Sequence, residues 1–154
     1  MILCYDGKKA SGCQALVDVL QAVGKAAESG GETESLVGEA ANIRELESKV
    51  EGKQILHIAT HGLTGSSQRP YDASLALTRP EKPSPGDIGF LTLDRLIRSW
   101  RSKLKDCDLV VLSACDTQRG IAKGDSVMAL PWGFFYAGAP TVVASLRKCS
   151  FPRE

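Results

Sequence analysis

Residues 54–61, QILHIATH, and residues 108–115, DLVVLSAC, decide the fold of this chain. Both stretches open with a short run that is almost continuously apolar and then turn polar. Such runs are typical of strands that are buried on both faces, as in a parallel sheet. They predict strands over 54–59 and 108–113, and the run TVVASL at 141–146 predicts a further buried strand of the same kind.

In other parts of the chain the apolar residues recur at the spacing of a helix. The pattern predicts helices over 11–28, 38–50 and 92–104 and two short outer strands over 1–5 and 74–77. A fourth helix is expected after Asp125, starting late or bending at Pro131. Residues 78–90, which carry several prolines and glycines, are expected to be irregular. Strands that alternate with helices predict an α/β fold with a mostly parallel sheet.

Composition excludes several classes of protein. The 154 residues fit one domain, and 43% hydrophobic residues with a formal net charge of +1 argue against intrinsic disorder. Nucleic acid and membrane surfaces are not expected as partners, because Lys and Arg are neither clustered nor in excess. No apolar run approaches the ~20 residues that span a bilayer, and no secretory signal opens the chain, so a cytoplasmic location is expected.

The cysteines and histidines do not form a metal-binding pattern. The sequence contains 5 cysteines at scattered spacing, with neither a CxxC pair nor an HExxH motif. An odd number of scattered cysteines in a chain of this length is expected to be free thiols. We therefore predict no metal site and no cofactor, and we expect Cys4, Cys13, Cys107 and Cys149 to be packing or surface thiols.

The two central strands each deliver a reactive side chain toward the same edge of the sheet. His61 and Cys115 both lie two residues beyond the predicted strand ends, and the carboxyl ends of parallel strands converge where such folds bind ligands. A histidine beside a cysteine raises its thiolate fraction and can pass the proton to a leaving amine. The N–H groups of Gly62 and Cys115 would then form an oxyanion hole.

Structural explanations of the same residues stay open. A cysteine at the end of an apolar strand is often an inert core residue, and Thr-His-Gly after a strand is often only a turn. His57 shares a strand face with His61, because side chains alternate along a strand. It is expected to be a hydrogen-bonded core histidine deeper in the sheet, and neither a catalytic residue nor a ligand.

Several blocks of the sequence, taken in order, resemble the CHAT domain. This is a caspase-like domain usually found beside tetratricopeptide repeats and related to caspases and separase. The resemblance covers about residues 36–146. Its blocks are GEAANIRELES (38–48), ILHIATHG (55–62), SLALT (74–78), GFLTLDRLI (89–97), LVVLSACDT (109–117), GDSVMAL (124–130) and FFYAGAPTVVASL (134–146).

The resemblance implies a caspase-like, three-layer α/β/α fold with a mostly parallel central sheet. In active members it implies a cysteine endopeptidase. The family histidine falls on His61, the glycine that follows this histidine falls on Gly62, and the family cysteine falls on Cys115. Its substrate would be a protein or peptide, and its partners could include tetratricopeptide-repeat proteins. Asp116, beside the cysteine, is a weaker candidate for orienting substrate, because a carboxylate there opposes thiolate formation. Ser145 is a candidate for the substrate pocket, together with the loops 63–73 and 117–124.

The sequence departs from the family pattern after residue 146. Family members continue with a tryptophan, an acidic turn and a further helix, whereas this chain reads RKCSFPRE over 147–154. We expect a single domain over 1–154 that lacks the last part of the family domain, as in a truncated relative or a fragment. That expectation keeps a second function open, a catalytically silent module that binds or scaffolds protein partners.

Overall fold

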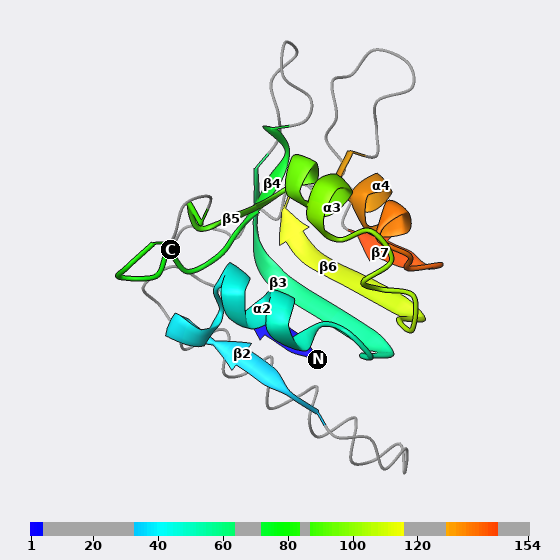
Figure 1. Cartoon of the computed structure of the whole chain (residues 1–154), viewed down its shortest axis with the longest axis horizontal. Coiled ribbons are helices and arrows are strands. Elements are labelled where there is room, and N and C mark those ends of the chain that lie inside the picture. The colour runs from blue at the N-terminus through cyan, green and yellow to red at the C-terminus, as the bar shows by residue number, and fades with distance from the viewer. Residues whose placement is uncertain (5–32, 64–71, 84–86, 116–128, 145–154) are drawn as a thin grey trace, which may run out of the picture.

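The computed structural model of the chain describes residues 1–4, 33–63, 72–83, 87–115 and 129–144 (Figure 1). Seven strands and three α-helices lie in these ranges, with one short 3₁₀ turn. In chain order they are β1 (Ile2–Cys4), β2 (Ser35–Val37), the turn η1 (Gly38–Ala40), α2 (Ile43–Lys49), β3 (Ile55–Leu63), β4 (Ser74–Ala76), β5 (Phe90–Thr92), α3 (Leu93–Ser99), β6 (Leu109–Cys115), α4 (Ala129–Tyr136) and β7 (Val142–Ala144).

The sheet is mostly parallel, as the sequence predicts. Strands β2, β1, β3, β6 and β7 follow one another in that spatial order, and each neighbouring pair is parallel. Strands β4 and β5 form an antiparallel extension that joins β3 at its carboxyl end. The long central pair β3 and β6 dominates the sheet in Figure 1. The mixed α/β class predicted from the alternation of strands and helices is confirmed.

One face of the sheet carries the core. On β3 and β6 the side chains of Leu56, Ile58, Val110 and Leu112 point into it and are buried. Helices α2, α3 and α4 lie over this same face (Figure 1). Helix α4 approaches α3 closely because position 133 is a glycine. A Cβ atom at Gly133 would lie 2.7 Å from Cδ1 of Leu96, closer than carbon atoms pack.

The opposite face of the sheet is only partly covered. Ile55 is 53% exposed and Val143 is 53% exposed, and the described residues place no helix over them. The predicted helix over 11–28 lies outside the described residues. Of the expected three layers, the described part of the chain therefore contains the sheet and one helical layer, consistent with a caspase-like α/β fold.

The helices are shorter than their apolar patterns suggest. The predicted helix over 38–50 divides into η1 and α2, because the side chain of Asn42 accepts a hydrogen bond from the Glu45 N–H and starts a new helix. The predicted cap of the next helix is confirmed: Thr92 Oγ1 accepts from the Arg95 N–H at 3.1 Å. Helix α3 ends at Ser99 and not at residue 104, because the chain then forms a turn through Ser102, whose φ is 61°.

Several strand assignments also differ from the sequence analysis. Strands β2 and β5 were not predicted; each has three residues and forms through pairing with a neighbour, not through an apolar run of its own. Strand β3 continues to Leu63, beyond the predicted end at residue 59, since Gly62 and Leu63 pair with β4. The predictions over 1–5, 74–77 and 141–146 are confirmed by β1, β4 and β7, and residues 5, 145 and 146 lie outside the described residues.

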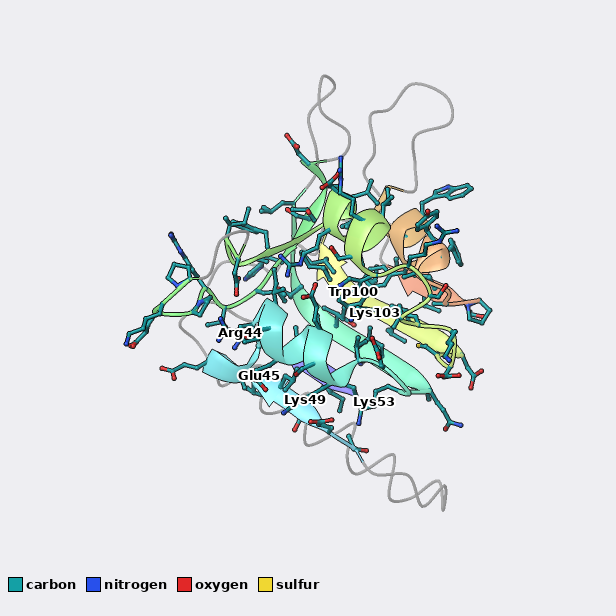
Figure 2. All side chains as sticks on the ribbon, viewed as in Figure 1. Arg44, Glu45, Lys49, Lys53, Trp100 and Lys103 are labelled. Atoms are coloured by element: carbon teal, nitrogen blue, oxygen red, sulfur yellow. The ribbon has the colours of Figure 1, made fainter. Side chains whose placement is uncertain are left out.

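A cluster of hydrogen-bonded side chains joins α2 to α3. Glu47 of α2 accepts hydrogen bonds from Nε and Nη2 of Arg95, at 2.7 and 2.9 Å, and from Nε1 of the buried Trp100 at 3.0 Å. Figure 2 labels Trp100 at this junction. The hydrogen bonds from Arg95 are the largest cause that lowers the pKa of Glu47, and the one from Trp100 lowers it further, against the opposing effect of burial.

We expect the replacement Glu47→Gln to destabilise the fold by about 1–2 kcal/mol at pH 7, because it removes the charge from these hydrogen bonds. A carboxyl whose pKa is lowered by folding stabilises the protein above its unfolded pKa, and this contribution is lost as the pH falls through the folded pKa. The difference between variant and wild type should therefore shrink toward pH 3. Denaturant unfolding at both pH values measures it, and Glu39→Gln on the exposed turn η1 is the control. An equal loss at both pH values would contradict the electrostatic origin.

Candidate active site

The pairing of β3 with β6 brings the two predicted catalytic positions together. These strands pair in parallel over seven positions, from Ile55 with Leu109 to His61 with Cys115. Neighbouring strands lie about 4.8 Å apart, so the backbones at His61 and Cys115 are separated by one strand spacing. The histidine and the cysteine form the last pair of this ladder, at the carboxyl edge of the parallel sheet. Ligands of open α/β sheets bind at this edge.

The sequence analysis misplaced one detail of this edge. It put both residues beyond the ends of their strands, whereas His61 lies inside β3 and Cys115 is the last residue of β6. Mutual pairing keeps both strands regular for longer than their apolar runs suggest, because ladder hydrogen bonds form irrespective of side-chain polarity. The alternative explanation of Thr-His-Gly as only a turn is therefore wrong, and this segment is strand.

Beside the candidate histidine, β3 gains a third neighbouring strand in addition to β1 and β6. Positions up to His61 pair with β6, and Gly62 pairs with Leu75 of β4. The hydroxyl of Thr60 also donates a hydrogen bond to the carbonyl oxygen of Ala76, which ties the same end of β3 to β4. His61 itself is exposed. The contacts with β4 therefore fix the backbone of β3 on both sides of His61, whose side chain is accessible.

The weaker candidates Asp116 and Ser145 lie outside the described residues, as do almost all residues of the predicted pocket loops 63–73 and 117–124. The structure therefore places three of the predicted site residues, His61, Gly62 and Cys115, at one edge of the sheet.

His57 makes a contact that the sequence analysis did not assign. Its Nε2 atom lies 2.6 Å from Oγ of Ser113 on the neighbouring strand. Burial lowers the pKa of His57, and the nearby amino terminus lowers it further, so the imidazole is neutral at pH 7. The hydrogen bond predicted for His57 is confirmed. Its predicted place in the core is wrong, because His57 is half-buried on the face of the sheet opposite to the core. Alternation places Ser113 on the same face of the sheet as His57, but only the register of the two strands shows that they are partners.

Cys107 provides a contrast to the candidate nucleophile. It is 2% exposed, and its thiol donates to the carbonyl oxygen of Leu109 at 3.4 Å. Burial raises its pKa, which keeps it a thiol at neutral pH. Its assignment as a packing cysteine is confirmed. Cys4 ends β1, and Cys13 and Cys149 lie outside the described residues.

A cavity of about 400 Å³ opens elsewhere, between α2 and α3. Charged and polar side chains dominate its lining, which comprises Ile43, Arg44, Glu47, Ser48, Asp87 and Arg95. It lies on the helical face of the sheet and includes neither His61 nor Cys115. Within the ranges that the structure describes, no helix has the length and apolar character needed to cross a membrane.

The fold and the edge site together define a class: a mixed α/β domain, consistent with the caspase-like fold, in which a histidine and a cysteine form the last pair between the two central strands. The family model of the CHAT domain matches residues 9–150, and the chain belongs to this family. The match begins earlier and ends slightly later than the resemblance over 36–146. No curated protein matches the chain.

Proposed function

We propose that this chain is a caspase-like cysteine endopeptidase domain in which His61 and Cys115 form the catalytic pair. The single observation that carries the proposal is their register: they are the last of seven parallel pairs between β3 and β6. Membership of the CHAT family, a caspase-like family of possible peptidases, supports it independently. The exposure of His61 supports it too, because a general base must reach the substrate.

The proposed reaction proceeds in two steps. The Cys115 thiol gives its proton to His61, and the thiolate attacks the carbonyl carbon of a peptide bond. The C–N bond breaks, the leaving amine takes the proton from the imidazolium, and a thioester joins the acyl group to Cys115. His61 then accepts a proton from water as the water attacks the thioester, and the acid product and the free thiol are released. No metal or redox cofactor is required by these steps.

Secondary roles complete the proposal. The N–H groups of Gly62 and Cys115 are the proposed donors to the oxyanion, since both residues belong to the same edge of the sheet. Asp116 and Ser145 are proposed to contact a protein or peptide substrate. The proposal further includes a cytoplasmic location and association with tetratricopeptide-repeat proteins.

Selective alkylation tests the catalytic pair directly. We expect iodoacetamide to modify Cys115 faster than Cys107 at pH 7, with a pH midpoint well below that of free cysteine, because a neighbouring imidazole raises the thiolate fraction. Peptide mapping of partly labelled protein measures each cysteine separately. In His61→Ala the rate at Cys115 should fall about tenfold or more at pH 7.

The matched control is His57→Ala, which removes the other histidine of the same strand. It should affect Cys115 far less than His61→Ala does. A wild-type Cys115 that reacts no faster than free cysteine, or a rate indifferent to His61, would overturn the proposed pair.

One observation favours a second candidate function, a catalytically silent protein-interaction module. Helix α4 exposes Trp132 by 66%, Tyr136 by 49% and Phe135 by 37%, at the spacing of one helix face. Exposed aromatic side chains are enriched in protein interfaces. The alkylation experiment separates the two functions, because a silent module has no need of a reactive Cys115.

A further inference from the structure

The contact between His57 and Ser113 joins the two strands that carry the candidate catalytic pair. At 2.6 Å, Nε2 of His57 and Oγ of Ser113 are within strong hydrogen-bonding distance. His57 belongs to β3 and Ser113 to β6, so the bond crosses the central ladder of the sheet. It is a side-chain link in addition to the backbone pairing of the two strands.

The position of this link along the strands is specific. Ser113 pairs with Ala59, and the next pairs are Thr60 with Ala114 and His61 with Cys115. The hydrogen bond therefore lies just before the last two pairs of the β3–β6 ladder. Pairs at the end of a ladder open more readily than those inside it, because they lack a neighbour on one side. A bond at this point limits how far the end can open.

A second support at this edge acts on a different strand pair. Thr60 donates to Ala76 and Gly62 pairs with Leu75, which fixes β3 to β4. These contacts place His61 but do not touch β6. The His57–Ser113 hydrogen bond, in contrast, connects the side chains of β3 and β6 themselves.

The chemistry of the bond suits a permanent link. Burial favours the neutral form of the His57 imidazole, whose Nε2 either accepts a hydrogen bond from the Ser113 hydroxyl or donates one to it, depending on the tautomer. Substitution of either partner removes this cross-strand hydrogen bond.

We propose that His57 and Ser113 are positioning residues whose cross-strand hydrogen bond holds His61 and Cys115 at reacting distance. This inference rests on the proposed function, since it concerns the geometry of the same pair. Neither residue contacts substrate in the proposal. Their effect on the reaction passes entirely through the spacing of β3 and β6 at the edge.

The test measures alkylation of Cys115 by iodoacetamide over a pH range in the full chain. Ser113→Ala should lower the rate at pH 7 by about two- to tenfold, the range that corresponds to one hydrogen bond, and move the pH midpoint upward. Ser113→Thr keeps the hydroxyl and favours strand, so it should restore most of the wild-type rate. Circular dichroism and denaturant unfolding of each variant verify that the fold is retained.

The same substitution in a His61→Ala background distinguishes positioning from a general structural role. Once the base is gone, Ser113→Ala should change neither the rate nor the midpoint at Cys115. An equal effect in both backgrounds, or an unchanged midpoint in a folded Ser113→Ala variant, would overturn the positioning role while leaving the catalytic pair intact. A wild-type Cys115 without enhanced reactivity would instead overturn the proposed function itself.

Discussion

Replacing Cys115 with alanine is expected to abolish peptide cleavage, and replacing His61 with alanine is expected to slow it by about 10²- to 10⁴-fold. The first change removes the atom that forms the thioester. The second leaves the nucleophile without the group that takes its proton and later protonates the leaving amine. Digestion of a proteome-derived peptide library, followed by mass spectrometry of new termini, measures cleavage at any sequence that the enzyme accepts.

The control for this experiment is Cys107→Ala. Its thiol is buried and points to the Leu109 carbonyl, away from any proposed chemistry. It should leave cleavage within about threefold of wild type if the fold is retained. Cleavage that survives in Cys115→Ala at the wild-type rate would show that the activity has another origin.

The largest loss of stability is expected from Trp100→Ala, at about 3–5 kcal/mol. Trp100 is 0% exposed, its ring meets that of Phe134 edge-on with centroids 6.2 Å apart, and its Nε1 donates to Glu47. The replacement opens a cavity among α2, α3 and α4 and leaves Glu47 with Arg95 alone in the described cluster. Denaturant unfolding followed by fluorescence and circular dichroism measures the loss.

Two further tryptophan variants make this prediction specific. Trp100→Phe keeps most of the ring volume and removes the indole N–H, so it should cost about 1–2 kcal/mol. Trp132→Ala on the exposed side of α4 should change stability by less than about 0.5 kcal/mol. A similar loss at positions 100 and 132 would contradict the observed packing of α4 against α3.

The central part of this fold could be predicted because its strands are encoded by their own side chains. Strands β3 and β6 appear in the sequence as apolar runs, and β7 does as well. Strands β2 and β5 could not be recognised, since each has only three residues and so short a segment becomes strand only when a neighbour supplies the hydrogen bonds. The same reason explains why β3 and β6 run further than predicted.

The candidate pair could be anticipated from topology, but its surroundings could not. Parallel pairing of two buried strands is enough to bring His61 and Cys115 to one edge. The partner of His57 depends on which residue of β6 lies diagonally across the ladder, and that requires the register. The division of residues 38–50 into two elements depends on one hydrogen bond from the Glu45 N–H to the side chain of Asn42, which periodicity does not detect.

The pairing of β4 with the end of β3 has a mechanical consequence. The described strands connect β4 and β5 to β3 at Gly62 and Leu63, while β6 pairs only with β3 and β7. A force applied to β4 and β5 is therefore transmitted first to the end of β3 next to His61. It reaches Cys115 only through the pairing of β3 with β6. A force on β4 and β5 therefore acts on the backbone of the proposed base before it acts on the backbone of the proposed nucleophile.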